Sequence, residues 1–391
     1  MNWIQESEQY FLPVYRRLPL EVHYGQGVFL YDRQGKAYLD FFSGLGVNAL
    51  GYQHPRVQKA IERQLKRNLH LSNFFVQDVQ IELARKLLQL AGYDRLFFTN
   101  SGTEAIEGIL KIVKKWGKAR QKDHIICFEN AFHGRTLGAL SITAQEKYQK
   151  SFTPLLSGVI QLPYNDPEAL LHTVNGGTAA IFLEFIQGEG GIVPAEPQFI
   201  RAIRKVREQH QVLIVADEIQ AGIGRTGRFM AYQHFNVHPD LVASAKALGG
   251  GLPLGAFLVS APLTEVLQRG EHGTTFGGSP LSCAAGLAVI QEIEEKNLLQ
   301  HVQKTGAYLL NQLRNLQREF PELIKTVRGL GLMAAMEMHQ DTFPLVRKGL
   351  EKGIVLNSTA GNVLRLLPPL IVEPSHVDQG IEMIRDILKN L

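Results

Sequence analysis

An aspartate and a lysine each follow a short apolar segment of the chain. The run VLIVAD ends at Asp217, and the run LVASA leads to Lys246 and a series of glycines. Strands buried on both faces are typical of a parallel sheet, and open α/β sheets bind ligands at the carboxyl ends of such strands. A lysine there can form a Schiff base with an aldehyde, and an aspartate can keep a pyridine nitrogen protonated. The pair therefore points to pyridoxal phosphate (PLP), against the simpler interpretation of a solvated acid and a surface lysine.

Three other segments carry residue types that would complete such a site. RLFFTNSGTEAIEG predicts a strand, a polar turn and a helix whose first N–H groups could bind a phosphate, although a plain N-cap explains the same residues. ENAFHGRT places an aromatic ring and Arg135 after a further strand, which suits a ring stack and a bidentate carboxylate clamp. The alternative is a loop with a surface arginine. HGTTFGGSP is a third polar loop whose hydroxyls could bind phosphate.

GIGRTG, at residues 222–227, matches the glycine pattern of a dinucleotide site but lacks its setting. That pattern lies directly between a strand and a helix, whereas here the strand ends at Asp217 and no clear helix follows. We therefore expect these glycines to shape a turn. The 13 histidines show no metal-ligand spacing, so we expect no metal.

The composition is that of a soluble globular protein. A chain of 391 residues is longer than one hydrophobic core usually holds, so more than one domain is expected. A content of 45% hydrophobic and 20% charged residues is typical of a soluble protein. A net charge of +4 gives no case for nucleic acid, and no segment is long and apolar enough to predict a membrane span. Cys127 and Cys283 form no disulfide framework, and the N-terminus resembles no targeting peptide. A cytoplasmic location is expected.

Strand and helix patterns alternate through the middle of the chain and predict an α/β fold. The apolar strand candidates are 95–99, 124–128, 179–184, 212–217 and 241–245. Helical spacing between them predicts a mostly parallel sheet with crossover helices. Both chain ends carry shorter strand patterns, so we expect them to form one smaller α+β domain. The predicted divisions are 1–50 joining the small domain, 51–280 as the large cofactor-binding domain, and 281–391 as the C-terminal small domain.

Seven motifs in one order, spread over nearly the whole chain, resemble one family. They are NSGTEAIE, AFHGRT, EFIQGEGGI, DEIQAGIGRTG, AKALGGGLPLGA, HGTTFGGSP and RLLPPL. The chain resembles a class III (omega) aminotransferase of PLP fold type I, in the acetylornithine/ornithine branch. The resemblance implies transamination of the terminal amine of N-acetylornithine with 2-oxoglutarate, giving N-acetylglutamate semialdehyde and glutamate, as in arginine biosynthesis.

The resemblance also implies roles for residues at matching positions. Lys246 would bind PLP covalently and then carry a proton between substrate and cofactor, while Asp217 would pair with the pyridine nitrogen. The other implied cofactor contacts are Phe132 and Ile219 on the ring faces, Gln220 at the ring hydroxyl, Glu218 nearby, and Ser101, Gly102 and Thr103 at the phosphate. Thr275 would reach the phosphate of the neighbouring subunit's cofactor, which implies a homodimer with shared active sites.

Two substrates of different shape must use one site. The resemblance places Arg135 at a substrate carboxylate, helped by Tyr15, and Thr274 near the substrate. Glutamate reacts through its α-amine and so needs a second arginine near the ring, for which Arg365 is the candidate. Glu189 would cover that arginine and swing away for glutamate, with flanking glycines permitting the movement.

Leu45 bears on substrate choice. It stands where ornithine aminotransferases carry a tyrosine that recognises the free α-amine, and a leucine cannot bond that amine. An acylated ornithine is therefore the expected substrate, unless Leu45 merely packs in the core.

Three departures from the family pattern leave the precise substrate open. They are Phe185 after Glu184, Ser279 before Pro280, and Thr274 in place of a serine. The alternatives are N-succinylornithine, ornithine or 4-aminobutyrate aminotransferase, an aminomutase, an inactive binding protein of the same fold, and an NAD-dependent oxidoreductase. Acetyl and succinyl groups, and the pathway served, are not distinguished by the sequence.

Overall fold

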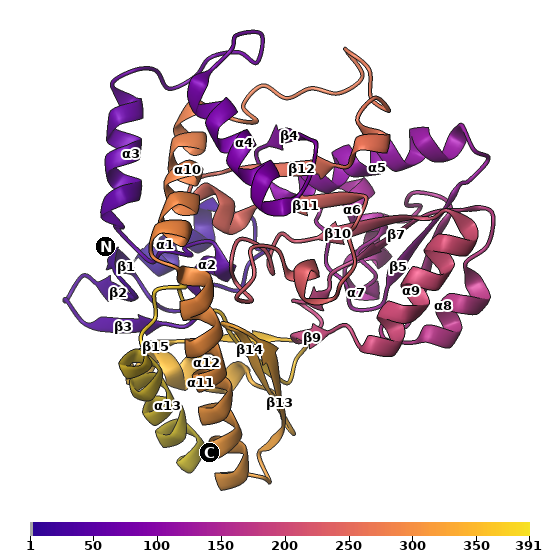
Figure 1. Ribbon diagram of the computed structural model, residues 1–391. Coiled ribbons are helices and arrows are strands. Elements are labelled where there is room, and N and C mark those ends of the chain that lie inside the picture. The colour runs from indigo at the N-terminus through magenta and orange to yellow at the C-terminus, as the bar shows by residue number, and fades with distance from the viewer. Residues whose placement is uncertain (1–2) are drawn as a thin grey trace.

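A seven-stranded sheet forms the centre of the computed structural model, which describes residues 3–391 (Figure 1). Its order is β4 (Arg95–Thr99), β12 (Gly255–Val259), β11 (Leu241–Ser244), β10 (Leu213–Asp217), β7 (Thr178–Leu183), β5 (His124–Phe128) and β6 (Val159–Leu162). The strands from β11 to β6 pair in parallel, whereas β12 is antiparallel to both of its neighbours. The predicted α/β fold with a mostly parallel sheet is confirmed.

Both faces of this sheet are buried, which explains the continuous apolar strands. Ile125 and Val215 belong to one hydrophobic cluster, and their neighbours Ile126 and Ile214 belong to another. Because successive side chains of a strand point to opposite faces, each strand contributes to two cores. Helix α5 (Gly102–Lys118) packs on the first face, and α9 (Pro197–His210), which lies beside α8 (Pro167–Thr173), contributes to the second core (Figure 1).

The two chain ends share a second sheet. Strands β1 (Val22–Gln26), β2 (Phe29–Asp32) and β3 (Ala37–Asp40) form a meander, and β15 (Ile354–Val355) pairs in parallel with β3. A third sheet has the order β13 (Ile324–Leu330), β14 (Met333–Met338), β17 (Val363–Leu366) and β16 (Asn357–Thr359). Residues far apart in sequence thus meet beneath the large sheet, while domain boundaries at residues 50 and 280 remain a prediction.

The remaining elements connect these sheets. The helices are α1 (Trp3–Tyr10), α2 (Ser43–Gly46), α3 (Pro55–Leu65), α4 (Asp78–Ala91), α6 (Leu137–Ser141), α7 (Glu146–Gln149), α10 (Pro280–Glu295), α11 (Leu298–Glu319), α12 (Phe343–Lys352) and α13 (Pro374–Lys389). Short 3₁₀ turns are η1 (Lys150–Phe152), η2 (Ala231–His234), η3 (Lys246–Gly249) and η4 (Ala261–Leu263), and β8 (Ile186–Gln187) pairs with β9 (Val193–Pro194). Within residues 3–391, no helix has the length and apolar character needed to cross a membrane.

Candidate active site

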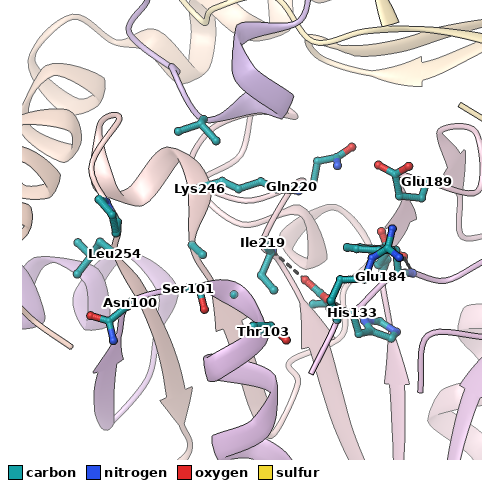
Figure 2. A pocket seen from close by; sticks show the side chains of 18 of the residues that line it. Asn100, Ser101, Thr103, His133, Glu184, Glu189, Ile219, Gln220, Lys246 and Leu254 are labelled. Carbon is teal, nitrogen blue, oxygen red and sulfur yellow. Dashed lines mark hydrogen bonds and ion pairs between the residues drawn. The ribbon is translucent and has the colours of Figure 1, made fainter. Parts of the chain in front are cut away.

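A cavity of about 490 Å³ lies at the carboxyl ends of the parallel strands. Ten of the predicted site residues line it: Ser101, Gly102, Thr103, Phe132, Arg135, Glu189, Asp217, Ile219, Gln220 and Lys246. Asp217 and Lys246 meet there because β10 and β11 are adjacent parallel strands, with Asp217 in register with Ala243. In Figure 2, Ser101 and Thr103 lie at the start of α5, and Lys246 and Gln220 lie beyond Ile219 from them.

Asp217 is held by a histidine to which the sequence analysis gave no role. His133 Nδ1 lies 2.7 Å from Asp217 Oδ2, and Ile219 N donates to Asp217 Oδ1 at 3.0 Å. An ionised carboxylate only accepts hydrogen bonds, so the proton of the first contact belongs to His133. Burial alone would lower the pKa of His133, but the hydrogen bond and charge of Asp217 raise it. The pair fixes the carboxylate and leaves it further acceptor positions toward the cavity.

Lys246 follows β11 in an uncommon backbone conformation. Its φ is +48°, in the left-handed region that a residue with a side chain seldom occupies, and it begins the 3₁₀ turn η3. Burial lowers the pKa of Lys246, and the positive charge of Arg365 lowers it further. A depressed pKa increases the fraction of neutral amine, which is the nucleophilic form.

The start of α5 has the features of an anion site. Ser101 is the N-cap and its side chain accepts from Glu104 N at 3.3 Å, while the N–H groups of the first turn have no acceptor within the helix. Gly102 is required by packing, because a Cβ there would lie 2.6 Å from Ile219 Cδ1. The helix start and Ile219 are therefore in close contact at the cavity wall.

Arg365 and Glu189 form the pair that the resemblance implied. Arg365 Nη1 lies 2.6 Å from Glu189 Oε1 and 3.2 Å from Gln220 Oε1. Burial would raise the pKa of Glu189, but Arg365 holds it below its usual value. The glycines beside Glu189 are also tightly packed, since a Cβ on Gly188 would lie 2.5 Å from Gln220 Oε1.

Arg135 lies at the exposed side of the cavity. Its guanidinium carbon is 3.9 Å from the centroid of the Tyr148 ring and 5.3 Å from that of Phe132. It has no carboxylate partner among residues 3–391 within ion-pair distance. The stacked position leaves its planar fork available for a carboxylate.

Glu184 is a second cavity residue without a role in the sequence analysis. Its carboxylate accepts from Phe132 N at 3.0 Å and from Gly188 N at 2.8 Å. Burial raises the pKa of Glu184 to about 7, which the nearby charge of His133 opposes. Glu184 therefore ties the Phe132 loop to the turn that carries Glu189.

The structure does not place Glu218 at the cofactor position that the family resemblance implied. Its carboxylate accepts from Ala231 N at 2.6 Å and Tyr232 N at 2.8 Å, and Glu218 is not among the cavity-lining residues. Burial raises its pKa to about 8. The side chain points away from Asp217 because neighbouring residues of an extended chain alternate in direction. Glu218 supports the loop after β10 and does not face the cofactor position.

Four other predicted residues lie outside the cavity lining. Arg365 reaches it through Glu189 and Gln220, and Thr274 Oγ1 accepts from Asn100 Nδ2 at 3.2 Å next to it. Tyr15 is 75% exposed, and Thr275 is also exposed. Their contacts with substrate and with a neighbouring subunit stay predictions.

Leu45 lies in a tight turn beside the cavity. Its φ is +65°, it is only partly buried, and it is absent from the hydrophobic clusters of the described chain. Val47, two residues later, lines the cavity. Partial burial does not favour the alternative that Leu45 packs in the core, and its role in substrate choice stays a prediction.

Comparison with known proteins shows the family of the chain. The model of the family "Aminotransferase class-III" matches residues 11–388. The chain belongs to the class III aminotransferases. The acetylornithine aminotransferase of Methanocaldococcus jannaschii is 44% identical over 393 residues, covering 100% of this chain and 98% of that protein.

Solved aminotransferase structures share the fold. The acetylornithine aminotransferase structure from Elizabethkingia anophelis is similar with a TM-score of 0.89 at 31% identity, covering 100% of this chain and 98% of that one. An ornithine aminotransferase structure from Toxoplasma gondii, described with partial occupancy of PLP at its active site, gives a TM-score of 0.94 at 32% identity, with 99% and 93% covered.

Proposed function

We propose that this class III aminotransferase uses PLP to transfer the terminal amine of N-acetylornithine to 2-oxoglutarate. The observation that carries the proposal is the meeting of Lys246 and Asp217 in one cavity with the start of α5, whose first N–H groups could bind an anion. The acetyl group is supported by the similarity to the M. jannaschii acetylornithine aminotransferase over the full chain. This substrate would place the enzyme in arginine biosynthesis.

The cavity suits PLP in the chemistry of its residues. A phosphate matches the N–H groups at Gly102 and Thr103, and an aromatic ring matches Phe132 and Ile219. Asp217, fixed by His133, retains acceptor positions for a protonated ring nitrogen. When bound, PLP supplies an aldehyde that holds amines and a ring that accepts electrons from the adjacent carbon.

The residues of the chain have separable tasks in this reaction. Lys246 Nζ, with its lowered pKa, would hold the cofactor at rest and then move a proton at the reacting carbon. The negative charge of Asp217 would keep the ring nitrogen protonated. Arg135 would bind the distant carboxylate of the acylated ornithine, and Arg365 the carboxylate of glutamate nearest the ring once Glu189 has moved.

We expect N-acetylornithine to have a higher kcat/KM than free ornithine by at least about tenfold, because a free α-amine would be left without a partner beside Leu45. Steady-state kinetics with N-acetylornithine, N-succinylornithine, ornithine and 4-aminobutyrate measure this preference. Leu45→Tyr should raise kcat/KM for ornithine relative to N-acetylornithine. A parent enzyme that prefers ornithine would refute the proposed substrate.

We also propose a homodimer with shared active sites. Phe74 is 97% exposed and Val76 is 86% exposed, and Leu69, Phe75 and Phe276 add to the apolar surface of these loops. Such exposure is typical of a surface covered by a partner. Thr275 is adjacent to Phe276, which supports its predicted contact with the neighbouring subunit's cofactor.

A cytoplasmic location stays a prediction.

A further inference from the structure

Strand β16 contacts both members of the Arg365–Glu189 pair. It is an edge strand, paired in antiparallel register with β17 so that Asn357 lies opposite Arg365. Asn357 and Thr359 are two residues apart and so project to the same face of the sheet. One contacts the arginine and the other contacts the glutamate.

Arg365 is held independently of Glu189. Asn357 Oδ1 accepts from Arg365 Nε at 2.9 Å and from Nη2 at 2.7 Å, and Gln220 Oε1 accepts from Nη1 at 3.2 Å. Arg365 is 2% exposed, and its strand β17 pairs with β14 on one side and with β16 on the other. If Glu189 leaves, these three contacts still fix the guanidinium, and Nη1 becomes available to another carboxylate.

Glu189 is held by fewer contacts, and Thr359 makes two of them. Thr359 Oγ1 lies 2.9 Å from the backbone oxygen of Glu189 and 3.2 Å from its Oε2. A hydroxyl has one proton, so it is shared between these oxygens or alternates between them. Thr359 is buried, whereas the Glu189 side chain is 24% exposed. Glu189 is therefore the member that can move.

We infer that Thr359 is a specificity-determining positioning residue that sets the balance between covered and uncovered Arg365. Its hydroxyl stabilises the covered state through the carboxylate and anchors the turn through the backbone oxygen. Only the uncovered state can bind a dicarboxylate at Arg365, so apparent dicarboxylate affinity falls with the fraction of that state. This inference rests on the proposed function, because it assumes that Arg365 receives the carboxylate of glutamate.

Thr359→Val tests the inference, since valine keeps the shape and the β-branched side chain of a strand residue but lacks the hydroxyl. Isothermal titration of the PLP-loaded protein with glutarate measures dicarboxylate binding without turnover. We expect Thr359→Val to lower the Kd for glutarate about fivefold, as for the loss of one hydrogen bond. Thr359→Ala should act in the same direction, and Thr359→Ser should restore the parent Kd.

Three further variants separate this effect from a general disturbance of β16. Thr342 is also buried, and its hydroxyl lies 2.6 Å from Ser358 Oγ in β16 but does not contact Glu189. Thr342→Val removes this hydroxyl and should leave the Kd for glutarate unchanged. Arg365→Ala should weaken glutarate binding strongly, and Glu189→Ala should strengthen it. An unchanged or higher Kd for Thr359→Val, with binding still dependent on Arg365, would overturn this inference alone. Binding independent of Arg365 would overturn the proposed handling of glutamate as well.

Discussion

Lys246→Ala should give a folded protein whose transamination rate is lower by more than about 100-fold, the usual scale for removing a group that transfers a proton. The loss follows from the position of Lys246 in the cavity. Lys246 is the only lysine among the described residues lining the cavity, so no other amine can hold the cofactor or return a proton to the same carbon. Steady-state transamination with N-acetylornithine and 2-oxoglutarate measures the loss.

Lys122→Ala is a matched control for the loss of a buried lysine. Lys122 is also buried, its pKa is lowered by burial, and its Nζ donates to Thr178 O and His210 O outside the active-site cavity. This variant should lose thermal stability and keep kcat. Turnover by Lys246→Ala at a few per cent of the parent rate would contradict the role of Lys246.

Asp217→Asn should retain PLP but lower kcat by about 10²–10³-fold, as for removal of an electrostatic group that acts on the reacting charge. Asparagine keeps an oxygen for Ile219 N but removes the negative charge that both His133 and a protonated ring nitrogen require. Absorbance spectra measure cofactor content, and kcat measures the electronic effect.

Asp240→Asn is the corresponding control. Asp240 precedes β11 at the opposite end of the same sheet and accepts from Ile214 N at 2.8 Å and Arg207 Nη2 at 2.7 Å. Its loss should reduce stability without changing kcat per bound cofactor. An Asp217→Asn variant with the parent kcat would show that the pyridine-nitrogen assignment is wrong.

The sequence predicts the centre of the site because strand ends are easy to recognise. Apolar runs that stop at Asp217 and Lys246 become adjacent strands, and adjacent parallel strands bring their ends to one edge. Glu184 lies at the end of the predicted strand 179–184, so its position at the same edge of the sheet also follows from the sequence. Strands β6 and β12 were not predicted, and β12 runs antiparallel between two strands far apart in sequence.

Contacts between distant loops are harder to predict from one sequence. The His133–Asp217 pair joins residues 84 positions apart, and its signal was only a histidine beside Phe132 in AFHGRT. The direction of the Glu218 side chain, opposite to that of Asp217, follows from the alternation of side chains along a strand. The family resemblance instead led us to expect Glu218 near the cofactor. The predicted partner of Thr275 would belong to a second copy of the chain, so its role depends on the proposed dimer.

Reduction of the purified holoenzyme with borohydride tests most directly the claim that Lys246 holds PLP in this cavity. Borohydride converts a lysine–PLP linkage into a stable secondary amine, and peptide mass spectrometry locates the modified lysine. The account predicts one pyridoxyl phosphate group per chain, on the peptide that contains Lys246, with loss of the modification in Lys246→Ala. A modification chiefly on another lysine, or none in enzyme that transaminates N-acetylornithine, would contradict it.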